Sequence, residues 1–222
     1  MKIIRQIEVF APDYLGKMDV LIAGGKILAV EEQLEGGYEG VEVEELSGEG
    51  KVLTPGFIDC HFHILGGGGE GGYQNRTPEV TLSQLTTAGV TTVVGCLGTD
   101  GEGRDMTALI SKAKGLEAEG ISTYVYEGSY RLPVKTVTDS IIKDFLTIDK
   151  IIGIGEIAVS DHRSSQPSFE EFARAVADAR VGGMLSGKAG IINVHLGGGK
   201  RKLELLTRIV EETEIPITQF LP

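Results

Sequence analysis

The stretch TPGFIDCHFH, residues 54–63, decides the fold, because the character of the chain changes there. A Pro-Gly turn is followed by a short apolar run that ends in two histidines, His61 and His63. Residues i and i+2 of a strand point to the same side, so a strand here presents both imidazoles on one face. Neutral imidazole is the commonest protein ligand for zinc-like metals. The stretch therefore predicts a strand that carries part of a metal site. Two strand histidines with ordinary hydrogen bonds are the alternative.

The residues before this stretch predict a small domain of strands and turns. Gly24-Gly25 is a two-residue hairpin signal between two of the strands. Short runs of alternating apolar residues mark the predicted strands at residues 2–9, 18–23, 26–30 and 41–46. We expect residues 1–54 to form a small antiparallel, β-sandwich-like domain.

After this stretch, apolar runs alternate with segments of helical period, a pattern typical of a parallel sheet. The predicted helices cover residues 78–88, 106–119, 139–147, 168–184 and 201–212. The predicted strands cover residues 57–63, 91–97, 121–126, 151–158, 191–196 and 217–221. No glycine fingerprint opens a helix directly after the first strand, which argues against an open doubly wound sheet. Residues 55–222 therefore predict the N-terminal part of a (β/α)₈ barrel, with five βα units and a sixth strand.

Charge and cysteine content exclude several classes of function. The chain of 222 residues has 21 Lys and Arg against 32 Asp and Glu, a formal net charge of −11. An acidic surface repels phosphate backbones and anionic membranes, so we expect no nucleic acid and no membrane as partner. Two cysteines make no disulfide framework, and the N-terminus contains no apolar stretch typical of a signal peptide. These features predict a cytoplasmic protein.

Two further residues extend the predicted metal site. His195 ends the predicted strand 191–196, at the face where barrel active sites are built. With His61 and His63 on the same rim, a ligand is favoured over a buried core histidine. Glu156 lies in an otherwise apolar strand, where a carboxylate needs a partner. A buried salt bridge and a bridge between two metals both satisfy that need.

Other polar residues follow the predicted strands and are candidates for the same barrel mouth. Arg163 presents a planar fork that suits a carboxylate. Glu70, Thr99 and Tyr130 follow the first, second and third predicted strands. Solvated loop residues are the alternative interpretation for these three. Cys60, which alternates with His61, is expected to face the helices as a packing residue.

Several of these motifs together resemble one known family. Residues 54–63 resemble the first-strand signature of the amidohydrolase superfamily. The run HFHILGGGGE at 61–70, with RTPE at 76–79, GTD at 98–100 and SDHRS at 160–164, resembles the bacterial isoaspartyl (β-aspartyl) dipeptidases. The similarity continues to the end of the chain. It implies a (β/α)₈ barrel with a small β domain, in which two divalent metal ions, Zn²⁺, support hydrolysis of the isopeptide bond of small β-aspartyl dipeptides.

The resemblance also implies roles for the metal-binding and catalytic residues. His61 and His63 match the ligands of one metal, and His195 matches a ligand of the other. Tyr130 matches a catalytic tyrosine that polarises the scissile carbonyl. The bridging ligand of the family is a carbamylated lysine, whereas this sequence has Glu156 at the matching position.

The resemblance further implies a set of substrate-binding residues. Glu70 and Thr99 match positions that hold the free α-amino group of the substrate. Arg163 matches an arginine that binds a substrate carboxylate, and Tyr130 also contacts the substrate. Gly68 is one of the glycines that let backbone amides approach the substrate.

The family's pattern extends beyond the Leu-Pro that ends this sequence. It includes a further metal-binding histidine, a substrate arginine and a catalytic aspartate. We therefore expect the chain to be the N-terminal part of such an enzyme and the complete enzyme to be a homo-oligomer. Two other interpretations stay open: another cyclic-amide amidohydrolase, similar to dihydroorotase or hydantoinase, and a non-catalytic truncated product that needs its missing half.

Overall fold

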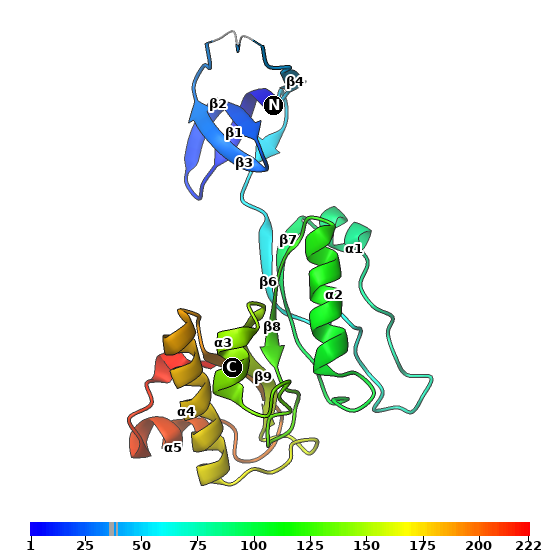
Figure 1. The fold of residues 1–222 in the computed structure, drawn as a ribbon, viewed down its shortest axis with the longest axis vertical. Coiled ribbons are helices and arrows are strands. Elements are labelled where there is room, and N and C mark those ends of the chain that lie inside the picture. The colour runs from blue at the N-terminus through cyan, green and yellow to red at the C-terminus, as the bar shows by residue number, and fades with distance from the viewer. Residues whose placement is uncertain (36–37, 39) are drawn as a thin grey trace. The chain divides into compact units, whose positions relative to one another are not determined.

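The computed structural model describes residues 1–35, 38 and 40–222, and the chain forms two compact units, Met1–Gly56 and Phe57–Pro222 (Figure 1). The sequence pattern placed the change two residues earlier, between 54 and 55. Each unit has its own sheet and its own buried cluster of apolar side chains.

The first unit is a five-stranded sheet with β5 beside β1 and the other strands in the order β3-β2-β1-β4. The first three strands pair antiparallel, as expected, whereas β4 and β5 pair with β1 in parallel. Their bounds are β1 (Lys2–Phe10), β2 (Tyr14–Ala23), β3 (Lys26–Glu31), β4 (Glu44–Ser47) and β5 (Val52–Leu53). Gly24 and Gly25 connect β2 to β3 with φ of 58° and 73°. Two consecutive positive φ angles are typical of the predicted two-residue hairpin turn.

The second unit is a six-stranded parallel sheet whose strands lie side by side in chain order, from β6 to β11. The strands are β6 (Phe57–Phe62), β7 (Val90–Gly95), β8 (Ser122–Glu127), β9 (Ile151–Val159), β10 (Ile191–Leu196) and β11 (Phe220–Leu221). The helices are α1 (Leu82–Thr87), α2 (Met106–Ala118), α3 (Ile141–Thr147), α4 (Phe169–Ser186) and α5 (Glu204–Glu212). Sequential parallel strands joined by helices form a half-barrel, which confirms the predicted fold class.

Local capping signals explain where α2, α3 and α4 begin. Asp105 accepts a hydrogen bond from the Ala108 N–H at the start of α2, and Ser140 is the N-cap of α3. The predicted capping box of α4 is confirmed, because Ser168 and Glu171 exchange hydrogen bonds at 3.2 and 2.8 Å. These caps satisfy backbone N–H groups that have no partner inside a helix.

Two predicted boundaries in this unit are wrong. Thr77-Pro78 does not open a helix, because the Gly67 N–H donates to Thr77 Oγ1 at 2.7 Å and ties this segment to the glycine-rich loop. The helix α1 begins later, at Leu82. The last predicted strand begins as a 3₁₀ turn, Ile217–Gln219, and only Phe220–Leu221 pair with β10.

Alternation along the strands places side chains in two separate apolar clusters. Val93 of β7 lies in the large core that the helices cover, together with Leu109 of α2 and Phe172 of α4. Val94 and Cys96 lie in a second cluster with Tyr126 and the half-buried Ile152 and Ile191. Neighbouring residues of a strand point to opposite faces, so this second cluster marks the face that a barrel turns inward. Among the described residues, no helix is long and apolar enough to cross a membrane.

Candidate active site

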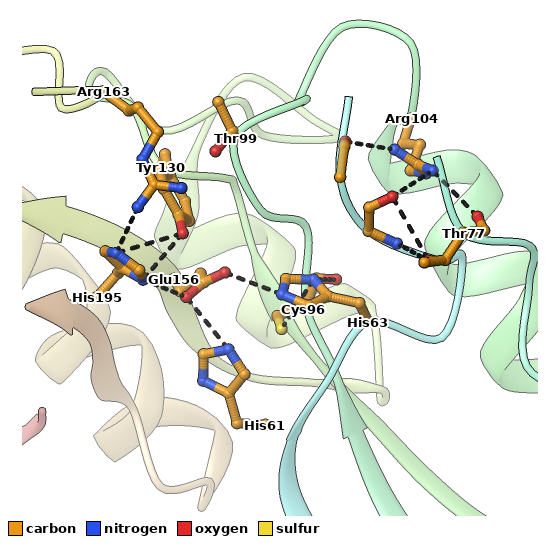
Figure 2. Close-up of polar contacts among 12 residues, drawn as sticks. His61, His63, Thr77, Cys96, Thr99, Arg104, Tyr130, Glu156, Arg163 and His195 are labelled. Carbon is orange, nitrogen blue, oxygen red and sulfur yellow. Dashed lines mark hydrogen bonds and ion pairs between the residues drawn. The ribbon is translucent and has the colours of Figure 1, made fainter. Parts of the chain in front are cut away.

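The carboxyl ends of the parallel strands bring four predicted metal ligands together (Figure 2). His61 lies on β6 and His63 directly follows that strand. Glu156 lies on β9, and His195 lies on β10. Parallel strands end at the same edge of a sheet, so residues far apart in the sequence meet there.

The Glu156 carboxylate lies at the centre of the three imidazoles. Its Oε2 is 3.1 Å from His61 Nε2 and 3.3 Å from His195 Nδ1. Its Oε1 is 3.2 Å from His63 Nε2. Only 1% of the Glu156 surface is exposed, whereas the three histidines stay partly open to solvent. The carboxylate therefore lies at the buried bottom of the cluster, and the imidazoles lie between it and solvent.

The imidazoles keep this buried carboxylate ionised. Burial opposes ionisation of Glu156, but the neighbouring imidazoles of His61 and His63 outweigh it and lower its pKa to about 2. The hydrogen bond to Glu156 in turn raises the pKa of His61. A negative carboxylate surrounded by ring nitrogens is an arrangement that a cation stabilises.

This donor set fits a divalent metal ion of the zinc type, which takes imidazole nitrogen and carboxylate oxygen as ligands. Within the described residues, Glu156 Oε1 is buried and has no hydrogen-bond partner of good geometry. Gly98 keeps the space beside that oxygen clear, because a Cβ there would lie 3.4 Å from Oε1 and 3.0 Å from His63 Cε1. A buried anionic oxygen beside such a space is suited to a bound cation.

Cys96, which the sequence pattern did not single out, belongs to the same cluster. Its sulfur and one donor atom each of His61, His63 and Glu156 all lie within 4.8 Å of one another. The thiol is 3.7 Å from His63 Nδ1, and burial followed by the Glu156 charge raises its pKa. Cys60 is exposed, so its predicted packing against the helices is wrong.

A second group of predicted residues carries two opposite charges beside this cluster. Thr99 Oγ1 donates to Glu70 Oε1 at 2.8 Å, and Arg163 Nη1 donates to the same oxygen at 3.0 Å. Asp161 accepts from Arg163 Nε and Nη2, both at 2.9 Å, which fixes the plane of the guanidinium. Hydrogen bonds from Thr99 and then Arg163 lower the pKa of Glu70, so this carboxylate is ionised at neutral pH.

Tyr130 joins the two groups. Its hydroxyl lies 2.9 Å from His195 Nδ1, and its ring faces the Arg163 guanidinium at 5.0 Å. Burial and then the Glu156 charge raise the pKa of Tyr130 to about 12. At neutral pH the phenol is therefore protonated and is a hydrogen-bond donor next to the cluster.

Gly68 lies between the metal-ligand candidates and the charged pair. It lines a pocket of about 690 Å³ with His61 and His63, and another of about 370 Å³ with Glu70 and Thr99. Its φ is 75°, and a Cβ there would lie 2.7 Å from the Asn75 carbonyl oxygen. Only glycine fits this position without strain.

Arg104 holds the loop that contains Gly68, a role without a sequence signal (Figure 2). Its guanidinium donates to the carbonyl oxygens of Leu65 and Gly67, both at 3.1 Å. Longer hydrogen bonds of 3.4 Å reach the carbonyls of Gly68 and Thr77. The four carbonyls belong to the start and the end of the loop, so the Arg104 side chain holds these two segments together.

Comparison with known proteins agrees with a half-barrel that has a histidine and carboxylate cluster at its strand ends. No protein-family model matches the chain. It is 32% identical over 117 residues to imidazolonepropionase of Chromobacterium violaceum, a match that covers 51% of this chain and 28% of that protein. It is 25% identical over 223 residues to dihydroorotase of Lactobacillus johnsonii, covering 96% of this chain and 49% of that protein. The chain is similar to both of these enzymes and spans half or less of the length of each.

The similarity is much stronger to one solved structure, a β-aspartyl dipeptidase of Fervidobacterium islandicum AW-1 in complex with the β-Asp-Leu dipeptide. The two chains are 55% identical and superpose with a TM-score of 0.93. The match covers 99% of this chain and 57% of that one. The resemblance to the β-aspartyl dipeptidases of the amidohydrolase superfamily is therefore confirmed over nearly the whole chain.

Proposed function

We propose that this protein hydrolyses the isopeptide bond of β-aspartyl dipeptides, and that His61, His63, Glu156 and His195 hold divalent metal ions for the reaction. The observation that carries the proposal is the 55% identity to a β-aspartyl dipeptidase over 99% of this chain. The chain spans 57% of the length of that enzyme, so the proposal concerns the natural protein as a whole.

The charged pair supports a zwitterionic dipeptide as substrate. A β-aspartyl dipeptide has a free α-ammonium group and free carboxylates. Arg163 is suited to a carboxylate, and Glu70 with Thr99 is suited to an ammonium group. In the structure Arg163 and Glu70 neutralise each other at 3.0 Å. A substrate that carries both charges gives each residue a partner of its own, whereas dihydroorotate has no ammonium group for Glu70.

The chain's own residues have separate tasks in this reaction. Bound divalent metal ions would polarise the scissile carbonyl and make water more acidic. The protonated hydroxyl of Tyr130 lies beside His195 and is placed to donate a hydrogen bond to a developing oxyanion. Asp161 fixes the guanidinium of Arg163, which would orient the substrate carboxylate.

A substrate comparison tests the proposal. The natural protein is loaded with Zn²⁺ and assayed on β-Asp-Leu, α-Asp-Leu and dihydroorotate. We expect the protein to release leucine from β-Asp-Leu but not from α-Asp-Leu, and to leave dihydroorotate unopened. Opening of dihydroorotate with β-Asp-Leu left intact would contradict the proposal and favour a cyclic-amide hydrolase.

Glu70 gives this assay a matched pair of variants. We expect E70Q to raise the KM for β-Asp-Leu by about 10- to 100-fold, the effect of one lost charged hydrogen bond. Glu102 lies in the neighbouring loop with 82% of its side chain exposed, and E102Q should leave KM unchanged. Equal KM values for E70Q and E102Q would remove Glu70 from the substrate site.

A further inference from the structure

Cys96 occupies an unusual place for a packing residue. It directly follows β7 and shares the inward face of the sheet with Val94 and Tyr126. Its surface is 1% exposed. In Figure 2 its sulfur lies beside the His63 ring, on the side of the cluster where Glu156 lies. Cys96 therefore belongs to this apolar face and also lies close to the metal-ligand candidates.

The distances suit a fourth ligand. The sulfur and the donor atoms of His61, His63 and Glu156 lie within 4.8 Å of one another. Around a tetrahedral zinc ion, bond lengths of about 2.0–2.3 Å place neighbouring donor atoms roughly 3.3–3.6 Å apart. The cluster therefore needs to contract by only about 1 Å to enclose an ion in that geometry.

A second observation points independently to a cation at the same place. Glu156 Oε1 is buried and has no hydrogen-bond partner of good geometry among the described residues. Gly98 keeps the space beside it free of a side chain. The thiol therefore lies beside a buried anionic oxygen that a cation would stabilise. A cysteine that serves only for packing would not be expected at such a place.

We propose that Cys96 binds, as a thiolate, the metal ion that His61 and His63 hold. The S–H bond breaks, a bond forms between Sγ and the metal, and the proton leaves to solvent. The negative charges of Glu156 and the thiolate then balance one dication. This inference rests on the metal centre of the proposed function but not on its substrate. It predicts a stronger preference for soft, thiophilic ions than a site built from nitrogen and oxygen alone.

Cobalt spectroscopy tests the proposal directly. The protein is stripped with a chelator and loaded with Co²⁺, whose thiolate complexes absorb in the near ultraviolet by charge transfer. We expect this absorption in the unaltered protein and in C60S, and its loss in C96S. Cys60 is the matched control, because it is exposed and precedes His61 directly. Zinc affinity should fall at least about tenfold in C96S and stay unchanged in C60S.

X-ray absorption of the zinc-loaded C60S variant gives a second test that does not depend on how C96S folds. The chain has two cysteines, so Cys96 is the only one left in C60S. We expect a zinc–sulfur distance of about 2.3 Å. A zinc spectrum without sulfur, or a charge-transfer band that persists in C96S, would overturn the proposal.

The outcomes separate this proposal from the proposed function. A sulfur signal without hydrolysis of β-Asp-Leu supports the thiolate ligand and contradicts the dipeptidase. Hydrolysis without a sulfur signal does the reverse. Failure to bind cobalt and zinc contradicts the thiolate ligand and the metal centre together.

Discussion

Two carboxylates on neighbouring strands, Glu127 of β8 and Glu156 of β9, are equally buried, but their pKa values are shifted in opposite directions. Their surfaces are 0% and 1% exposed. Burial and then the neighbouring Asp144 raise the pKa of Glu127 to about 10. Burial acts on Glu156 as well, but His61 and His63 outweigh it and lower the pKa to about 2. Glu127 is therefore neutral at pH 7, whereas Glu156 is charged.

The difference teaches that neighbours, and not depth, decide what a buried carboxylate does. Asp144 accepts hydrogen bonds from the Val137 N–H and the Thr138 hydroxyl, both at 2.5 Å, and so keeps its own charge. Glu127 beside it remains protonated at pH 7. Glu156 has imidazoles around it, which suit a cation and not a second carboxyl group.

The largest expected effect concerns metal binding at Glu156. We expect E156Q to lower zinc affinity by more than about 100-fold, because a neutral amide is a poor ligand for a dication. E127Q is the control, since it changes an equally buried carboxylate on the adjacent strand. Equilibrium dialysis with elemental analysis measures both. Equal zinc contents in the two variants would mean that Glu156 is no ligand.

A smaller effect is expected at Asp144. D144N should lower the free energy of unfolding by about 2–3 kcal/mol, because an ionised acceptor of several hydrogen bonds is lost. Asp149, an exposed residue near the end of α3, provides the control D149N. Urea unfolding at pH 7 measures the difference. If D144N unfolds at the same urea concentration as D149N, Asp144 does not hold the loop after β8.

Glu127 makes stability depend on pH. Its pKa is raised from 4.5 to about 10, so the folded state binds the proton more tightly than the unfolded state between these values. Stability from this group is complete below pH 4.5 and decreases as pH rises towards 10. We expect E127Q to remove a slope of at most about 1.4 kcal/mol per pH unit. Urea unfolding midpoints of the unaltered protein and of E127Q are compared between pH 6 and about pH 9. Identical changes with pH in the two proteins would show that Glu127 has an ordinary pKa.

The smallest expected effect is none at all. The family resemblance matches Glu156 to a carbamylated lysine, and a glutamate carboxylate needs no carbon dioxide. Metal uptake in bicarbonate-free buffer should therefore equal uptake with bicarbonate, whereas E156K should depend on bicarbonate. A bicarbonate requirement of the unaltered protein would show that a lysine elsewhere supplies the ligand.

The parts of the molecule that the sequence predicted are those with local signals. Alternating strand and helix periods predicted the half-barrel, and Ser168 with Glu171 predicted the start of α4. The spacing of His61 and His63 placed both imidazoles on one face. Glu156 attracted notice because a lone carboxylate interrupts an apolar strand.

The parts that sequence did not predict depend on contacts between distant segments. Thr77-Pro78 has the local signature of a helix start, but Thr77 bonds Gly67 instead. Cys96 forms no metal-binding motif with residues near it in the sequence, because its neighbours in the cluster come from β6, the residue after it and β9. Glu127 ends an ordinary strand, and only the packing of α3 places Asp144 beside it.

Arg104 has a consequence for the entropy of ligand binding. Glycine loses more conformational freedom on folding than any other residue, so the run Gly66–Gly69 is costly to order. The guanidinium orders the loop before a ligand arrives, through the carbonyls of Leu65 and Gly67. A ligand that contacts Gly68 therefore binds without an ordering cost of its own. Backbone amides of this loop should therefore exchange their hydrogens slowly in the free protein. Their exchange rate would depend on Arg104, although Arg104 contacts the carbonyl oxygens of the loop and not its amides.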